Sequence, residues 1–164
     1  MRIMKKILSL LLVVTMTMAM GLTALAADGT QADTNVTTKT VTFNIYKDKE
    51  ELLAGPITVT VDSGTTLDKA VEKLMNYFPN FKFGTYQGEA YRYLESMIIN
   101  GEAYKSESST TVNGNHGHYE GSDWEYYVGE KMNDNTYGQV YMSSYVINDN
   151  INVFLNFAYS SFDW

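Results

Sequence analysis

The sequence predicts an α+β fold, in which a mixed sheet of about four to five strands packs on one helix. Three observations lead to this expectation. Apolar and polar residues alternate in four short segments, which is the period of a half-buried strand. The period changes once, to the spacing of an amphipathic helix. The sequence contains no internal repeat, so a single domain is expected over residues 40–164.

The first two alternating segments are expected to form a hairpin. Residues 41–45 and 57–61 carry Val, Phe or Ile at every second position. A charged turn at 47–51 and the dipeptide Gly55-Pro56 lie between them. Two strands joined by a short polar loop are typical of an antiparallel hairpin.

The helix is expected directly after this hairpin, before Pro79, which should end it. Thr65 and Asp68 resemble a capping box, with Asp in place of the usual Glu. The apolar residues that recur at helical spacing are Leu67, Ala70, Val71, Leu74, Met75 and Phe78.

The middle of the chain gives weaker signals. Residues 81–93 are rich in Tyr, Phe and Gly, and are consistent with either an irregular loop or a frayed strand. Residues 94–99 are apolar and lead into Asn100-Gly101, a strong signal for a tight turn. Residues 105–122 are mostly Ser, Thr, Asn, Gly and His, which predicts a long surface loop.

Two later segments alternate and should complete the sheet. Residues 124–128 place Trp124, Tyr126 and Val128 on one face, and residues 151–157 alternate behind a polar turn. Strand, strand, helix and then further strands is the order of a β-grasp-like fold, in which a mixed sheet wraps one helix. The expected core residues are Phe43, Ile45, Val59, Leu67, Val71, Leu74, Trp124, Val153 and Leu155.

Residues 1–26 have the three parts of a secretory signal peptide. Arg2, Lys5 and Lys6 precede a short apolar stretch, and a small-x-small site follows at Ala24 and Ala26. The alternative is a retained membrane anchor, but the apolar stretch is shorter than the roughly 20 residues that span a bilayer. We therefore expect cleavage after residue 26 or 27. Residues 27–39 have almost nothing to bury and should form a flexible leader.

Charge and cysteine content exclude several classes of function. Without the signal, 9 basic residues remain against 19 acidic residues, a net charge of −10. Nucleic acid is therefore not an expected partner, because phosphate binding needs clustered cations. The absence of Cys excludes a lipoprotein anchor, thiolate metal sites and a cysteine nucleophile. Export without disulfides suggests the surface or culture fluid of a Gram-positive bacterium.

Four stretches of the chain resemble one known family. VTVDSGTTLDKA at 59–70 is similar to a strand, Gly-Thr-Thr-Leu, helix passage. YLESMIING at 93–101, DWEYYVG at 123–129 and YVINDNI at 145–151 are similar, in the same order, to later strands and turns of that family. On these motifs, which cover roughly residues 40–158, the sequence resembles the transcobalamin C-terminal-like domains of secreted bacterial proteins.

The resemblance implies a β-grasp fold and a domain that covers one face of a corrinoid, with cobalamin as the expected ligand. In the animal carriers of the family a larger helical domain supplies the other half of the site. This chain alone is therefore expected to form only half of the binding site for a corrinoid. Two turns depart from the family pattern. They are Val128-Gly129-Glu130, which lacks an Asn, and Asn148-Asp149-Asn150, in place of Asp-Gly-Asp. Asn tolerates left-handed turn geometry, so the departures affect the ligand assignment more than the fold.

Tyrosines are the leading candidates for recognition, because the chain has 13 of them. Tyr supplies rigid contact area with a hydrogen-bonding tip. The alternative is that they pack at the rim of a small core. Those expected in loops or on the outer face of a strand are Tyr86, Tyr91, Tyr127, Tyr137 and Tyr141.

Side-chain alternation predicts where a binding surface would lie. If Trp124, Tyr126 and Val128 face the helix, then Glu125 and Tyr127 face outward. An outward Tyr127 beside the aromatic segment 86–91 would form a flat shelf that suits a corrin face, a sugar ring or the edge of a partner. The candidate ligand-binding residues are Tyr86, Tyr91, Trp124, Tyr126 and Tyr127.

His116 and His118 raise the possibility of a metal site or a ligand to the cobalt of a corrinoid. The alternative, two solvated histidines in a polar loop, is preferred because two imidazoles make an incomplete ligand set. Asp134 and Asp149, each flanked by Asn, are explained by turn chemistry and lack the spacing of a calcium-binding loop. No metal is therefore expected.

No motif points to catalysis. The sequence lacks Gly-x-Ser-x-Gly, His-Glu-x-x-His and a phosphate-binding Gly loop, and no pair of acidic residues is distinguished by its surroundings. Two functions remain. One is a secreted or cell-surface module that binds a corrinoid or a related small ligand. The other is a surface interaction or adhesion protein that binds a glycan, a peptide or a partner protein.

Overall fold

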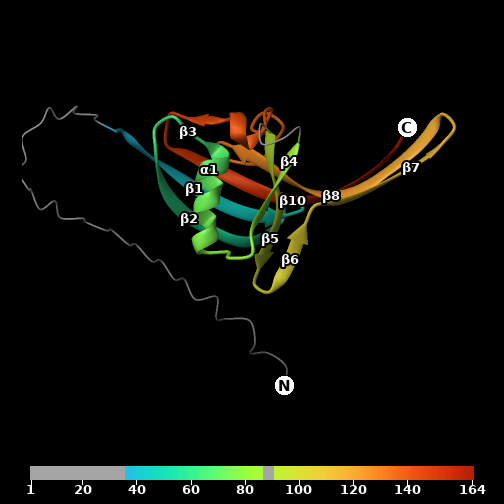
Figure 1. Ribbon diagram of the computed structural model, residues 1–164, viewed down its shortest axis with the longest axis horizontal. Helices are drawn as coiled ribbons and strands as arrows, with labels where there is room; N and C mark the ends of the chain where they lie inside the picture. The colour runs from blue at the N-terminus through green and yellow to red at the C-terminus, as the bar shows by residue number, and fades with distance from the viewer. Residues whose placement is uncertain (1–35, 87–90) are drawn as a thin grey trace, which may run out of the picture. The chain divides into compact units, whose positions relative to one another are not determined.

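Strands form most of the part of the chain that the structure describes (Figure 1). The computed structural model describes residues 36–86 and 91–164. The expected signal peptide and most of the expected leader lie outside these residues. The first strand begins at Thr38, so the last residues assigned to the leader belong to the sheet.

The described residues contain ten strands and three short helical segments. The longer strands are β1 (Thr38–Lys47), β2 (Glu51–Asp62), β5 (Tyr91–Ile99), β7 (Glu107–Asn113), β8 (His116–Val128) and β10 (Ile151–Asp163). The shorter ones are β3 (Thr65–Thr66), β4 (Lys82–Tyr86), β6 (Glu102–Lys105) and β9 (Val146–Ile147). The helical segments are α1 (Leu67–Glu72) and the 3-10 turns η1 (Lys73–Asn76) and η3 (Met142–Ser144).

The strands pair in three sheets. The largest has five strands in the order β2-β1-β10-β8-β7, and a second has three strands in the order β4-β5-β6. β3 and β9 form a two-stranded sheet. At the centre of the largest sheet β1 runs parallel to β10, with Phe43 opposite Val153 and Ile45 opposite Leu155. The other pairs of neighbouring strands are antiparallel.

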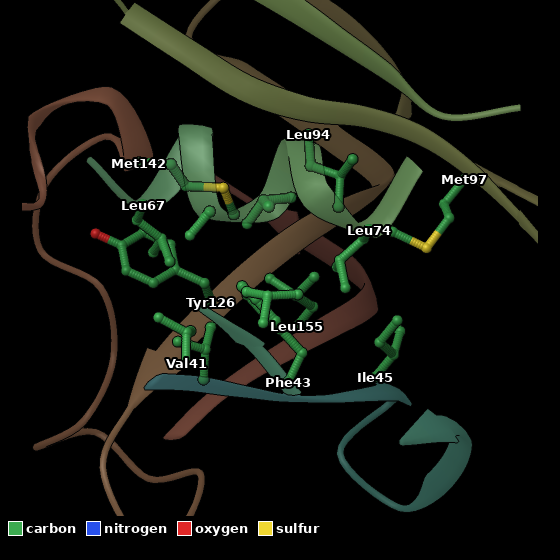
Figure 2. Close-up of a cluster of buried hydrophobic side chains, with 14 of the residues drawn as sticks. Val41, Phe43, Ile45, Leu67, Leu74, Leu94, Met97, Tyr126, Met142 and Leu155 are labelled. Atoms are coloured by element: carbon green, nitrogen blue, oxygen red, sulfur yellow. The ribbon is translucent and has the colours of Figure 1, made fainter. Parts of the chain in front are cut away.

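The α+β prediction of a β-grasp-like mixed sheet packed on one helix is wrong. The described residues are mostly β, with 62% of them in strands and 10% helical, and they form one short helix and several sheets. Several of the additional strands lie in residues 105–122, which were expected to be a loop, and in residues 81–93, which were consistent with either a loop or a frayed strand. The layer opposite the five-stranded sheet contains β5 and η3 as well as α1, so the helix alone does not cover the sheet (Figure 2).

The helix is shorter than its apolar periodicity predicts. After Glu72 the chain tightens into the 3-10 turn η1, which ends at Asn76. The predicted capping box is also absent, since Thr66 is the N-cap and its hydroxyl bonds the carboxylate of Asp68. Asp68 is buried and pairs with Arg92 of β5. Its carboxylate therefore connects the helix to β5 and does not cap the helix. No helix in the described ranges is long and apolar enough to cross a membrane.

Residues 105–122, expected to be a surface loop, form most of a hairpin. β7 pairs with β8 in a continuous antiparallel register, and the end of β10 pairs along the other side of β8. We call residues 107–122 and 159–164 the arm. The arm projects beyond the helix and the three-stranded sheet (Figure 1). Residues 81–93 likewise contain β4 and the start of β5.

The predicted core is largely confirmed. Phe43, Ile45, Leu67, Leu74 and the other expected aliphatic residues are all buried, whereas Trp124 is only partly buried. Figure 2 shows side chains of β1 and β10 meeting those of the helix and β5. The turn at Asn100-Gly101 is also confirmed, with both residues at positive φ.

Candidate functional site

A pocket of about 290 Å³ lies between β5, β8 and the segment 137–142. These three stretches are distant in sequence, so only the folded protein brings them together. The residues that line the pocket are Arg92, Tyr93, Leu94, Trp124, Glu125, Tyr126, Tyr137, Gly138, Gln139, Val140, Tyr141 and Met142.

Strand β8 contributes the two most firmly held aromatic rings. The Tyr126 hydroxyl donates to the Val140 carbonyl at 2.5 Å, and the Trp124 indole N–H donates to the Tyr104 carbonyl at 3.2 Å. Burial raises the pKa of Tyr126 to about 12. Both rings therefore form a fixed wall of the pocket.

Gly138 allows the segment 137–142 to lie against this wall. Its N–H donates to the Tyr126 carbonyl at 2.8 Å. A Cβ atom at position 138 would lie 2.2 Å from Cζ of Tyr126, so the ring occupies the space that a side chain would need. Only glycine permits this close approach of backbone and ring.

Arg92 provides the charge in the wall of the pocket. Its Nη1 atom lies 2.9 Å from Oδ2 of Asp68 and 2.6 Å from Oε1 of Glu72. The guanidinium also lies over the ring of Phe83, with its Cζ atom 4.2 Å from the ring centroid. Two carboxylates balance one cation, so the pocket has no excess positive charge with which to attract an anion.

The segment 137–142 adds two exposed tyrosines. The Tyr141 ring lies 4.8 Å from that of Tyr91, and the Tyr137 ring lies 5.3 Å from that of Tyr127. Tyr137 and Tyr141 are 41% and 42% exposed, so each offers ring surface to a ligand. Burial of the rest of Tyr137 raises the pKa of its hydroxyl.

The structure brings two of the five candidate residues into this pocket and a third next to it. Trp124 and Tyr126 line it, and Tyr91 lies at its rim through the contact with Tyr141. Tyr86 is opposite Tyr91 in the β4–β5 ladder, is 55% exposed and does not line the pocket. Tyr127 lies on the opposite face of the sheet from Tyr126.

The prediction that Tyr127 is exposed is wrong, because only 1% of it is accessible. Its hydroxyl donates to Oε2 of Glu125 at 2.8 Å, and the Nζ atom of Lys49 lies 5.2 Å from its ring centroid. The chain after β8 folds back over this face and forms a bridge between Tyr127 and Tyr137. Burial raises the pKa of the Tyr127 hydroxyl. Alternation placed the side chain on the correct face but could not reveal the segment that covers it.

Arg92 and Gln139 are absent from the predicted site. Tyr137 and Tyr141 are among the tyrosines considered for recognition, but not among the five candidate ligand-binding residues. One signal for Arg92 exists in the sequence, since it is the single basic residue between Lys82 and Lys105. Its partners are 20 and 24 residues away, so no local pattern shows that its charge is balanced. Gln139 carries no signal of its own.

The two histidines lie in the arm, away from the pocket. His118 Nδ1 lies 2.7 Å from Oδ1 of Asp163, and His118 Nε2 lies 4.0 Å from Oε2 of Glu120. Within residues 36–86 and 91–164, no group of three or more His, Cys, Asp or Glu side chains is placed to hold a metal ion.

We expect His116→Ala and His118→Ala each to change the free energy of unfolding by less than about 0.5 kcal/mol, as for other exposed substitutions away from packed sites. Chemical denaturation followed by circular dichroism measures this change. A titration with Zn²⁺ and with cobalamin supplies the matching functional measurement. Tight binding of either by the wild type, lost in both variants, would show that the two histidines form a ligand site.

Comparison with known proteins adds no relative. No protein-family model matches the chain, and no curated protein matches it. Function is therefore argued from the residues of the site, because a fold on its own does not define an activity.

Proposed function

We propose that the protein is a secreted or cell-surface binding module that recognises a small ligand in this pocket, without catalysing a reaction on it. One observation carries the proposal. Aromatic rings and hydrogen-bonding groups from β5, β8 and the segment 137–142 converge on one concave surface. A concave site with aromatic walls and a few polar groups is typical of small-molecule recognition.

The chemistry of the wall favours a ring-shaped ligand that is partly polar and carries little charge. Tyrosine rings offer flat faces with hydroxyl tips, and Gln139 adds an amide that can both donate and accept hydrogen bonds. A sugar ring has this character, and so does the edge of a corrin. The corrinoid is the ligand that the family resemblance implies.

A corrinoid would be held only in part. A pocket of about 290 Å³ lies at the small end of the range for ligand sites, so most of such a large molecule would remain outside it. Affinity for cobalamin in isolation should therefore be modest. A second protein or domain that covers the rest of the ligand would increase it.

Calorimetry with cobalamin, and then with a panel of cell-wall glycans, tests the proposal. We expect Tyr141→Ala to weaken binding of the recognised ligand by about tenfold or more, because truncation of a central aromatic contact costs this much in many interfaces. Tyr141 is 42% exposed, so its removal should leave the fold intact.

Tyr77→Ala is the matched control, since Tyr77 is 55% exposed and does not line the pocket. It should bind as the wild type does. Tyr86→Ala tests the edge of the predicted site and should lower affinity by no more than about twofold, because Tyr86 does not line the pocket. Equal affinity of the wild type and Tyr141→Ala for a confirmed ligand would place the site elsewhere.

The second candidate function is a surface interaction or adhesion protein that binds a glycan, a peptide or a partner protein. The exposed aromatic residues of the arm support it. Tyr159, Phe162 and Trp164 are each more than half exposed, at 60%, 55% and 52%. Absence of heat with every small molecule tested would favour this function over the first.

A further inference from the structure

Among the strands of residues 36–86 and 91–164, none pairs with the outer edge of β7. This strand is the last in the order β2-β1-β10-β8-β7, and all seven of its residues are exposed. An edge strand presents unpaired N–H and C=O groups that can pair with another chain. The arm carries this edge away from the rest of the protein (Figure 1).

The opposite edge, β2, has features that hinder such pairing. It contains Pro56, which lacks an N–H, and its register with β1 shifts twice. The Thr60 carbonyl is already bonded by Lys73. β7 has neither proline nor a shift in its register with β8, and residues 108–112 carry no charge. The protections common on natural edge strands are therefore found on β2 and missing from β7.

One face of the arm carries three aromatic side chains, and Val112 of β7 lies on the same face. Tyr119 is opposite Phe162 on neighbouring strands, and the two rings stack at 5.1 Å. Phe162 in turn contacts Trp164 at 5.9 Å. Val112 of β7 is 64% exposed and lies opposite Gly117 of β8. The Trp164 ring packs against Gly117.

We propose that β7 pairs with β7 of a second copy of the chain, antiparallel and about a two-fold axis at Thr110. Thr110 is the middle residue of the strand. This register places Ser108 opposite Val112 and Glu107 opposite Asn113, so no like charges face each other. Glu107 is moreover paired within its own copy, since its carboxylate lies 2.9 Å from Nζ of Lys105.

The same register keeps the two faces of the ribbon consistent. Side chains opposite each other in an antiparallel pair lie on the same side of the sheet. The apolar faces of the two arms therefore join into one surface across the axis. Because β7 can pair with β7 of a second copy in this register, the pairing closes on itself and gives a two-fold dimer, the commonest symmetric assembly. The assembly does not depend on the pocket.

Analytical ultracentrifugation of the purified protein over the micromolar to millimolar range tests the proposal. The wild type should sediment as a dimer at high concentration and dissociate on dilution. Thr110→Lys, which sets two cations opposite each other on the axis, should remain a monomer throughout the range. Thr58→Lys is the matched control, an exposed Thr on the other edge strand, and should behave as the wild type. Equal melting temperatures of the variants show that the fold is retained.

Cross-linking gives a second measurement that does not depend on destabilising the dimer. The chain has no Cys, so Thr110→Cys introduces one reactive thiol. A short bis-maleimide should join two copies of Thr110→Cys and leave Thr58→Cys unlinked. The proposal is overturned if the wild type stays monomeric over the whole concentration range. It is also overturned if β7 pairs only with a strand of another protein. Equal cross-linking of Thr58→Cys and Thr110→Cys would also overturn it.

Discussion

Leu74→Ala should lower the free energy of unfolding by roughly 2–5 kcal/mol, the range for truncating a buried leucine. Leu74 is fully buried, and its side chain lies between β5 and the five-stranded sheet (Figure 2). Close packing on both sides prevents the surroundings from filling the space that three missing carbon atoms would leave. Equilibrium denaturation with urea, read by tryptophan fluorescence, measures the loss.

Met75→Ala is the control, one residue along the same turn. Met75 is 47% exposed, so its truncation should change the free energy of unfolding by less than about 0.5 kcal/mol. Equal effects of the two substitutions would mean that η1 does not face the core as described.

Arg92→Leu should cost about 3 kcal/mol, at the low end of the range for breaking a buried ion pair. The Arg92 side chain is 21% exposed, whereas that of Asp68 is only 3% exposed. Without the guanidinium, the Asp68 carboxylate would stay buried without its cation, although the Thr66 hydroxyl still donates to it. The leucine would also lose the contact over the Phe83 ring.

Asp68→Asn in the Arg92→Leu background should recover part of this loss, because it removes the uncompensated charge. Lys105→Ala is the contrasting variant, since the Lys105–Glu107 pair is open to solvent and its loss should leave stability nearly unchanged. Thermal and urea denaturation of the set would measure the coupling between positions 68 and 92. Additive effects of the Arg92 and Asp68 substitutions would contradict the ion pair.

Strands with one buried face could be predicted from the sequence because their signal is local. Phe43 and Ile45 alternate with polar residues, and their burial follows from that period. The turn at Asn100-Gly101 was equally local. The hairpin β7–β8 was missed because its β7 strand is exposed on both sides, so no alternation of apolar and polar residues marks it. Its Ser, Thr and Asn content resembled a loop, and the pairing that makes it a strand is with residues 116–122.

The site residues, like the strands, could be predicted only where the signal is local. Trp124 and Tyr126 were found because alternation along β8 assigns them to one face. The burial of Tyr127 depends on the chain at 129–137 folding back over it, and the balance of charge at Arg92 depends on α1. Both are tertiary contacts, which local patterns do not contain. The fold class was wrong for a related reason, since the strands that were missed outweigh one short helix.

The parallel pairing of β1 with β10 places the first and the last strand of the described chain side by side in the centre of the sheet. Beside this pair, the Thr40 N–H donates to Oδ1 of Asn150 across 110 residues of sequence. Contacts of such long range form late, because the whole intervening chain must first be brought together. For a chain that crosses a membrane N-terminus first, as the proposed export requires, β1 emerges long before its parallel neighbour. Until β10 arrives, the N-terminal hairpin is open to proteases outside the cell, so the last strand is the one that protects the first.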